Sequence, residues 1–128
     1  MKSLTCIALA LCVSPIVAAS QEMPEYFLDE IVAASWAEQV AKFCPQLSVN
    51  PISAAQLSQA LLERLSEDGI DLDTVEAASD ADAIAQRQAV FLEKHGLIEP
   101  DQAAICAAGR AEIAEGSPIG AYLTEVSQ

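Results

Sequence analysis

Hydrophobic residues recur at intervals of three and four along most of the chain after residue 23, the spacing of amphipathic helices. The pattern predicts helices over residues 24–44, from 53 to about 68, from 71 or 73 to 95, and from 100 to the glycine at 116. A short last helix follows over 117–123. No segment shows strand alternation longer than a few residues. We therefore expect an all-α fold, a small bundle of four main helices plus a short C-terminal helix.

Residues with strong local preferences mark the ends of these helices. Pro45 stops the first helix directly after Cys44, and residues 45–52 are expected to form a loop. Ser53 with Gln56 three residues later is a capping-box signature for the second helix. Three glycines follow the last apolar positions of the second, third and fourth helices and suit left-handed caps: Gly69, Gly96 and Gly116. A slip in the apolar period near Ser79 and Asp80 predicts a kink in the third helix.

The apolar stripes of the helices define the expected core. The broadest stripe lies on the first helix, where Trp36 fits the core better than a binding surface because of its spacing. Leu57, Leu61 and Leu65 line the second helix. Ile105, Cys106, Gly109 and Ile113 share one face of the fourth helix. The third and last helices supply further core candidates: Leu72, Val75, Ala81, Ile84, Phe91, Leu92, Ile119, Tyr122 and Leu123. Gly109 lies in the middle of the fourth helix, which indicates close approach by another helix.

Residues 1–20 have the features of a secretory signal peptide. Lys2 supplies the positive start, and an apolar run of about ten residues follows, too short to span a bilayer. Small residues then allow cleavage after Ala19 or after Ser20. A lipoprotein anchor on Cys12 is disfavoured because Leu11 precedes it where a small residue is required. We expect residues 21–128 to form a single helical domain in the periplasm, with no stable membrane insertion after signal removal.

Cysteine usage agrees with export. The chain has four cysteines, and Cys6 and Cys12 leave with the signal peptide. Cys44 and Cys106 remain, both on apolar helix faces. The exported compartment is oxidising, so we expect a disulfide between them.

The charge of the chain restricts its partners. It carries 19 acids against six Lys and Arg, a net charge of −13. Removal of the signal peptide takes Lys2 away and no acid, so the mature net charge is −14. Such a surface repels nucleic acid and anionic lipid. The charge serves solubility, or alternatively attracts a partner with a basic face.

No arrangement typical of a metal, cofactor or nucleophile site is found. The acids around Asp71 and Asp73 lack the alternation and central glycine of a calcium loop, since Val75 and Glu76 follow. Zinc prefers paired Cys and His ligands, and the mature chain keeps one His and two distant cysteines. His95 in the last turn of a helix suits the negative end of the helix dipole. We expect no cofactor and no metal.

The sequence 109–123, GRAEIAEGSPIGAYL, with Cys106 three residues before its first glycine, resembles a family of small exported bacterial proteins of unknown function. The AEQVAKFC, Gly-Ile-Asp and Leu-Glu-Lys-His-Gly segments upstream extend the resemblance over most of the chain after residue 25. Some members are labelled as an NADH dehydrogenase subunit. An iron–sulfur subunit needs four cysteine thiolates per cluster, more than the mature chain retains. The resemblance therefore implies a fold and no activity.

The same motif holds the candidate interaction residues Arg110, Glu112 and Tyr122. Arg110 either pairs with an acid of its own chain or anchors a partner. The short helix after Ser117 is expected to present Tyr122 at a surface, where Tyr and Arg are frequent anchors of interfaces. We expect a non-catalytic exported interaction or accessory protein whose partner is another protein. The alternatives are a periplasmic acid-stress chaperone and an unrecognised enzyme built on His95 and carboxylates.

Overall fold

A computed structural model describes residues 22–73 and 81–127 of the chain. Its helices and strands run in the order α1 (Glu25–Phe43), β1 (Leu47–Val49), α2 (Pro51–Glu67), α4 (Ala81–Lys94), α5 (Gln102–Glu115), α6 (Pro118–Tyr122) and β2 (Leu123–Glu125). The predicted fold class is confirmed, with four main helices and a short C-terminal one in the described part of the chain. The predicted kink at Ser79 and Asp80, and the core candidate Val75, lie outside the described residues.

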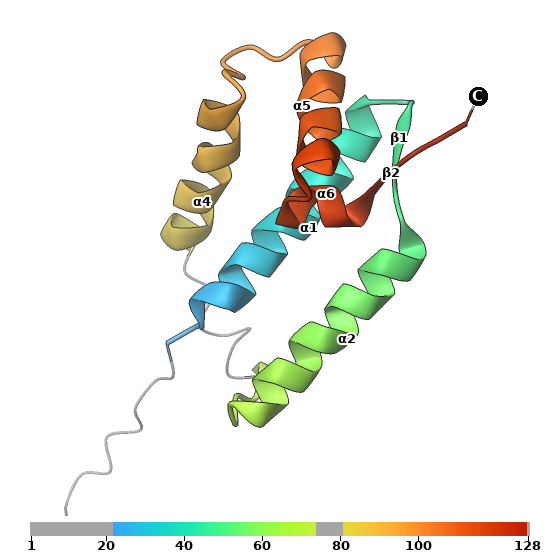
Figure 1. Cartoon of the computed structure of the whole chain (residues 1–128). Helices are drawn as coiled ribbons and strands as arrows, with labels where there is room; N and C mark the ends of the chain where they lie inside the picture. The colour runs from blue at the N-terminus through green and yellow to red at the C-terminus, as the bar shows by residue number, and fades with distance from the viewer. Residues whose placement is uncertain (1–21, 74–80, 128) are drawn as a thin grey trace, which may run out of the picture.

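The long helix α1 is the centre of the fold (Figure 1). It contacts α4, α5, α6 and β1, and to a smaller extent α2. Its buried residues are Leu28, Val32, Ala33, Ala37 and Val40. The alanines allow neighbouring helices to approach closely. Ile31 and Phe43, also on α1, are 36% and 50% exposed.

A two-stranded antiparallel sheet joins the loop after α1 to the C-terminal segment. Leu47 pairs with Glu125 and Val49 with Leu123. The expectation of a plain loop over residues 45–52 was therefore wrong for β1. Three-residue strands carry too little alternation to be recognised, and this pairing joins segments more than 70 residues apart in the sequence.

Helix α2 begins earlier than its capping-box signature predicts. Asn50 is the N-cap, and its side-chain oxygen accepts from the backbone N–H groups of Ile52 and Ser53 at 3.0 and 3.2 Å. Pro51 then occupies the first turn, where its missing N–H costs nothing. Leu65 is the one buried residue of α2. Leu72, a predicted core residue, is 47% exposed.

The predicted disulfide between Cys44 and Cys106 is confirmed. It joins the C-terminal cap of α1 to the first half of α5, with the two Cα atoms 5.2 Å apart and a sequence separation of 62. Cys44 is fully buried and Cys106 is 6% exposed. The bond therefore fixes α5 against the C-terminal end of α1. Within the described residues, no helix is long and apolar enough to cross a membrane.

Candidate functional site

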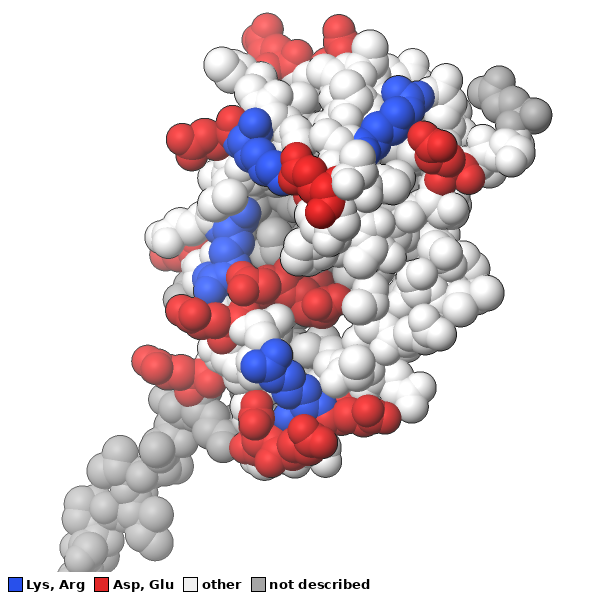
Figure 2. Space-filling view, viewed as in Figure 1, with Lys and Arg blue, Asp and Glu red and all other residues white. Residues whose placement is uncertain are grey.

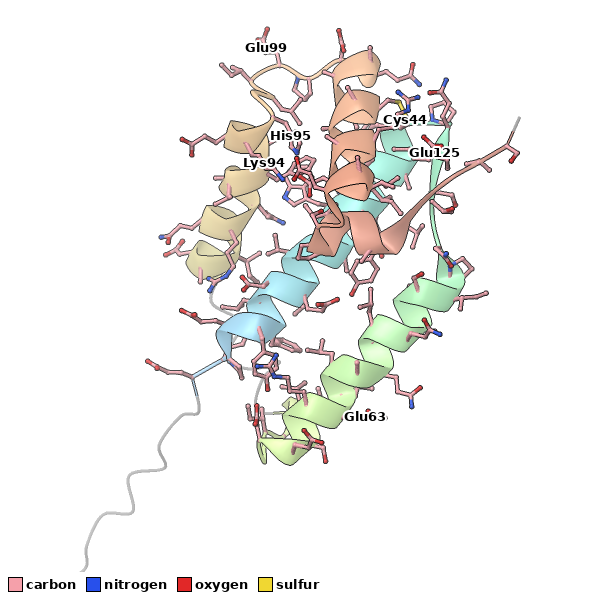
Figure 3. All side chains as sticks on the ribbon, in the orientation of Figure 1. Cys44, Glu63, Lys94, His95, Glu99 and Glu125 are labelled. Atoms are coloured by element: carbon pink, nitrogen blue, oxygen red, sulfur yellow. A yellow bond between two sulfur atoms is a disulfide. The ribbon has the colours of Figure 1, made fainter. Side chains whose placement is uncertain are left out.

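Glu112 is the buried charged residue of the described core, with 2% of its surface exposed. Its Oε1 atom lies 2.7 Å from Lys94 Nζ and 2.6 Å from His95 Nε2. Lys94 also donates to Glu115 at 2.6 Å. Figure 3 shows Lys94 and His95 extending from α4 toward α5. We call Glu112, Lys94, His95 and Ser117 the Glu112 cluster.

The cluster keeps Glu112 ionised despite its burial. Burial alone would raise the pKa of this carboxyl, but hydrogen bonds from Lys94, Ser117 and His95 and the charge of Lys94 outweigh it and lower the pKa. Hydrogen bonds to Glu112 and Glu115 raise the pKa of Lys94 in turn. An ionised carboxylate only accepts hydrogen bonds, so His95 Nε2 carries the hydrogen in this contact. The buried charge is therefore paired and hydrogen-bonded.

Local sequence explains how α4 supplies two of these groups. Gly96 adopts a φ of +63° directly after His95, which ends the helix and sends the chain away toward α5. Lys94 is therefore the last residue of α4, where a cation complements the helix dipole, and His95 follows it in the turn. Glu112 lies 18 residues after Lys94 and 17 residues after His95 in the sequence. This separation is too large for a helix-spacing pattern to predict the pairing.

The order of the groups differs from that of a hydrolase triad. In a triad the histidine lies between the nucleophile and the acid. Here the Glu112 carboxylate lies between the Ser117 hydroxyl and the His95 ring. The Ser117 oxygen also accepts from Gly120 N at 3.0 Å, which makes it the N-cap of α6. In the described ranges, no group of three or more His, Cys, Asp or Glu side chains could hold a metal ion.

The glycines of the 109–123 motif have packing roles. A Cβ atom on Gly109 would lie 2.5 Å from a Leu47 methyl and 2.6 Å from a Val40 methyl. A Cβ on Gly120 would clash with the backbone carbonyl of Glu112. Gly116 has a φ of +63° and caps α5 as expected. The motif therefore specifies a tight turn that brings α6 onto α5 beside Glu112.

The contacts of Arg110 are compatible with both of its predicted roles, pairing within the chain and binding a partner. Its guanidinium donates to the Gln46 side chain and lies 3.8 Å from the Glu125 carboxylate. Its side chain remains 45% exposed. It therefore has partners of its own chain beside the small sheet and still reaches the surface.

The expectation that Tyr122 is presented at a surface was wrong. The residue is only 4% exposed, and its hydroxyl donates to Glu30 on α1. Burial, followed by the bond to Glu30, raises the pKa of the tyrosine well above its ordinary value. The N-cap of α6, Ser117, donates its backbone N–H to the Glu112 carbonyl at 3.1 Å, and the five-residue helix that follows packs on α1 with Tyr122 directed inward. Glu112, the third candidate interaction residue, is likewise in the interior.

Two cavities flank Trp36, and both were missed by sequence reasoning because they exist only between packed helices. The first has a volume of about 430 Å³ and lies between the second half of α1, α4 and the loop before α5. We call it the α1–α4 groove. Its walls include Val40, Phe43, Leu92 and Leu97, and every residue that lines it is uncharged.

The second cavity has a volume of about 350 Å³ and lies between α1, α4 and the α5–α6 turn. We call it the Glu112 cavity. Trp36 and Phe91, whose rings stack with centroids 4.4 Å apart, form part of its wall. Arg87 and Lys94 also line it. On the face shown in Figure 2, the cationic side chains lie beside acidic ones, and Arg87 pairs with Asp29 at 2.8 Å.

Comparison with known proteins gives a family and no activity. No curated protein and no solved structure matches the chain. The model of DUF5333, a family of unknown function, matches residues 20–124. This range contains the Glu112 cluster, both cavities and both cysteines of the disulfide. The chain therefore belongs to the DUF5333 family of unknown function.

Proposed function

We propose that this protein is exported to the periplasm and acts there, without catalysis, by binding another protein in the α1–α4 groove. The signal-like features of residues 1–20 and the buried Cys44–Cys106 disulfide support export, because such bonds persist in oxidising compartments. Mass spectrometry of the periplasmic protein tests this part. A chain that begins at residue 20 or 21 is expected, and a retained Met1 or a lipid on Cys12 contradicts it.

The observation that carries the binding proposal is the contrast between the groove and the rest of the surface. A chain with a net charge of −13 leaves a groove of about 430 Å³ without any charged lining residue. Phe43 lines the groove and is 50% exposed. Ile98, in the loop that closes the groove, is 93% exposed. Apolar groups left exposed together, and rimmed by polar residues, mark interaction sites.

The surroundings of the groove define the partner. Two cations are sequence neighbours of lining residues, the exposed Lys42 and Arg87, which is paired with Asp29. Four exposed acids are also sequence neighbours of lining residues: Glu38, Glu93, Glu99 and Asp101. An apolar groove between two helices suits the apolar face of a third helix. The partner segment is therefore an amphipathic helix with Lys or Arg on its flanks, drawn to the acidic rim.

Site-specific crosslinking tests the location of the partner. A photoreactive residue in place of Gln88, which lines the groove, is compared with one in place of the exposed Gln56 on α2. Crosslinking in the periplasm is expected from position 88 and not from position 56. Mass spectrometry of the crosslinked peptide should identify a helix with basic flanks, and added salt should weaken the complex.

Neighbouring residues of α4 provide matched variants. Ala89 lines the groove and Val90 lines the Glu112 cavity, and both are exposed. Ala89→Phe fills the groove and is expected to abolish the crosslink from position 88. Val90→Phe adds a ring next to it and is expected to retain the crosslink. Equal loss in both variants, or crosslinks from position 56 of similar strength, contradicts the groove as the binding site.

Arg110 remains a second contact in this proposal, because its side chain is 45% exposed. Arg110→Ala separates its two roles. If Arg110 binds the partner, the complex is weakened while the thermal midpoint hardly moves. A lower midpoint with unchanged partner binding removes Arg110 from the interface.

An acid-stress chaperone is the second candidate, and the buried Glu112 cluster favours it. Protonation of Glu112 removes the charge that holds Lys94 and His95, which connects α4 to α5. Acid would then open the fold and expose its apolar helix faces. Cooperative opening near pH 3 together with suppression of aggregation of an acid-denatured client supports this candidate. Opening without any effect on the client rejects it.

A further inference from the structure

Helices α1 and α2 have a cavity of their own, which we call the α1–α2 cavity. Its volume is about 160 Å³, and its lining comes from two helix faces: Tyr26 and Glu30 on α1, and Leu57, Ala60, Leu61 and Arg64 on α2. Residues three and four apart share one side of a helix, so these side chains lie where the two helices face each other. Tyr26 donates to Asp68 at 2.6 Å, which holds the end of α2 near the start of α1 (Figure 1).

The cation of this cavity, Arg64, has no acidic partner in the described part of the chain. Its guanidinium lies 3.8 Å from the centroid of the Tyr26 ring, and it forms no ion pair or hydrogen bond there. By contrast, Arg87, Lys94 and Arg110 each lie beside a carboxylate. A guanidinium presents its N–H donors in a planar fork that fits a carboxylate. Arg64 is therefore available to bind a carboxylate from outside the chain.

The acid of the cavity, Glu30, has no cationic partner among the described residues. Its Oε1 accepts a hydrogen bond from the Tyr122 hydroxyl. Within the described ranges, Trp36 Nε1 is the one buried side-chain nitrogen or oxygen without a partner. Glu30 Oε2, which also has no described partner, is therefore accessible. Because Glu30 lines the α1–α2 cavity, this oxygen is available to a cationic donor.

The two unpaired charges are about one helical turn apart. The Arg64 guanidinium lies over Tyr26, and Glu30 follows Tyr26 by four residues, a rise of about 6 Å along α1. In an α-amino acid one carbon carries both the ammonium and the carboxylate, so a single molecule reaches both groups. Such a molecule has no net charge and is not repelled by a chain with a net charge of −13.

We propose that the α1–α2 cavity binds a small zwitterion of the α-amino acid class, whose carboxylate accepts from Arg64 and whose ammonium donates to Glu30. This inference goes beyond the proposed protein-binding function, because it concerns a different cavity and a small molecule. Leu57 and Leu61 form the apolar wall that receives the ligand side chain. The volume of about 160 Å³ restricts that side chain to a small one.

Nuclear magnetic resonance with L-alanine tests the site on the oxidised mature chain. The sequence contains three arginines, so a ¹⁵N-labelled sample gives three Nε–H peaks at mildly acidic pH. L-Alanine is expected to move the Arg64 peak in a saturable manner, because this guanidinium gains a carboxylate. The peaks of Arg87 and Arg110, which have acidic partners, should hardly move. An absent shift at Arg64, or equal shifts of all three peaks, overturns the proposal.

Two analogues test the zwitterion assignment. Propionate is alanine without the ammonium, and ethylamine is alanine without the carboxylate. Each is expected to bind about tenfold more weakly than L-alanine or worse, the effect of losing one charged hydrogen bond. Propionate that binds as tightly as L-alanine removes the role of Glu30. Ethylamine that binds as tightly removes the role of Arg64, and either result overturns the assignment.

Matched variants assign the binding to this cavity. Arg64→Gln is expected to weaken L-alanine binding about tenfold or more, whereas Lys42→Gln, which removes an exposed cation near the other end of α1, should leave it within about twofold. Ala60→Leu fills the cavity and should abolish binding. The same change at the exposed Ala55, which does not line the cavity, should preserve it. Equal affinities within either pair overturn the site.

All four substitutions are at exposed positions, so the variants are expected to keep the fold, and their thermal midpoints check this. Loss of the groove crosslink leaves these outcomes unaffected, so the two proposals fail separately.

Discussion

Glu112 and Lys94 form an ion pair of 2.7 Å between a carboxylate that is 2% exposed and an ammonium that is 41% exposed. The same Lys94 contacts Glu115, at 2.6 Å, whose side chain is 51% exposed. One cation therefore has a buried partner and an exposed partner at nearly equal distances. This arrangement allows the effect of burial to be measured with the cation held constant.

Glu112→Gln is expected to lower the free energy of unfolding by about 2–4 kcal/mol, because it removes one partner of a buried charged network. Glu115→Gln removes an exposed partner of the same lysine and should cost less than about 1 kcal/mol. Urea unfolding of both variants measures the difference. Similar small losses in both would show that the buried pair adds nothing beyond a surface ion pair.

The pKa shifts predict a stability that falls at both ends of the pH range. The folded pKa of Glu112 is lower than the ordinary value of 4.5, so its contribution is present above pH 4.5 and is lost as the pH falls through the folded value. The pKa of Lys94 is raised above 10.5, so its contribution is present below that pH and is lost as the pH rises. The raised pKa of Tyr122 likewise makes alkaline conditions above pH 10.0 unfavourable to folding.

Thermal unfolding from pH 2 to pH 11 checks these directions. Protonation of the other acids relieves charge repulsion and acts in the opposite sense at low pH. Glu112→Gln isolates the cluster, since the stability difference between the native chain and this variant should shrink below pH 4.5. A difference that is constant across the acidic range would falsify the assignment of the acid sensitivity to Glu112.

Gly120→Ala is expected to destabilise the fold more than Gly109→Ala. The new Cβ at position 120 meets the backbone of Glu112, which cannot move without displacing α5. At position 109 it meets the methyl groups of Leu47 and Val40, which have some freedom to rotate, and alanine gains about 1 kcal/mol of helix propensity over glycine. Chemical unfolding of the two variants gives the order. A milder effect at position 120 contradicts the close-approach role of that glycine.

Reduction of the Cys44–Cys106 disulfide should lower the free energy of unfolding by roughly 4 kcal/mol on the chain-entropy model for the closed loop of 62 residues. The unreduced, unfolded chain should contain no free thiol. A double Cys44→Ala, Cys106→Ala variant provides the control without reductant. Two reactive thiols in the unreduced protein without residues 1–20 would contradict the bond.

The sequence by itself determined the features that depend on a few neighbouring residues. Four main helices and a short fifth follow from the hydrophobic period, and Gly69, Gly96 and Gly116 all have the positive φ expected of helix ends. Ser117, a residue type that favours the N-cap, caps α6. These features were predictable because helix periodicity and capping involve groups within about four residues of one another. The disulfide pair was predictable because the expected loss of residues 1–20 leaves two cysteines, both on apolar helix faces.

Only the tertiary structure decided which side chains share a site. Asn50 displaced Ser53 as the cap of α2 because β1 places residue 50 against Tyr122, whose carbonyl accepts from Asn50 N at 2.8 Å. Tyr122 is buried because Gly120 allows α6 to pack directly on the α5 backbone. Lys94, His95 and Glu112 look like ordinary exposed helix residues in the sequence. Their contacts and the unpaired Trp36 donor arise from the packing of separate helices, which no short-range pattern encodes.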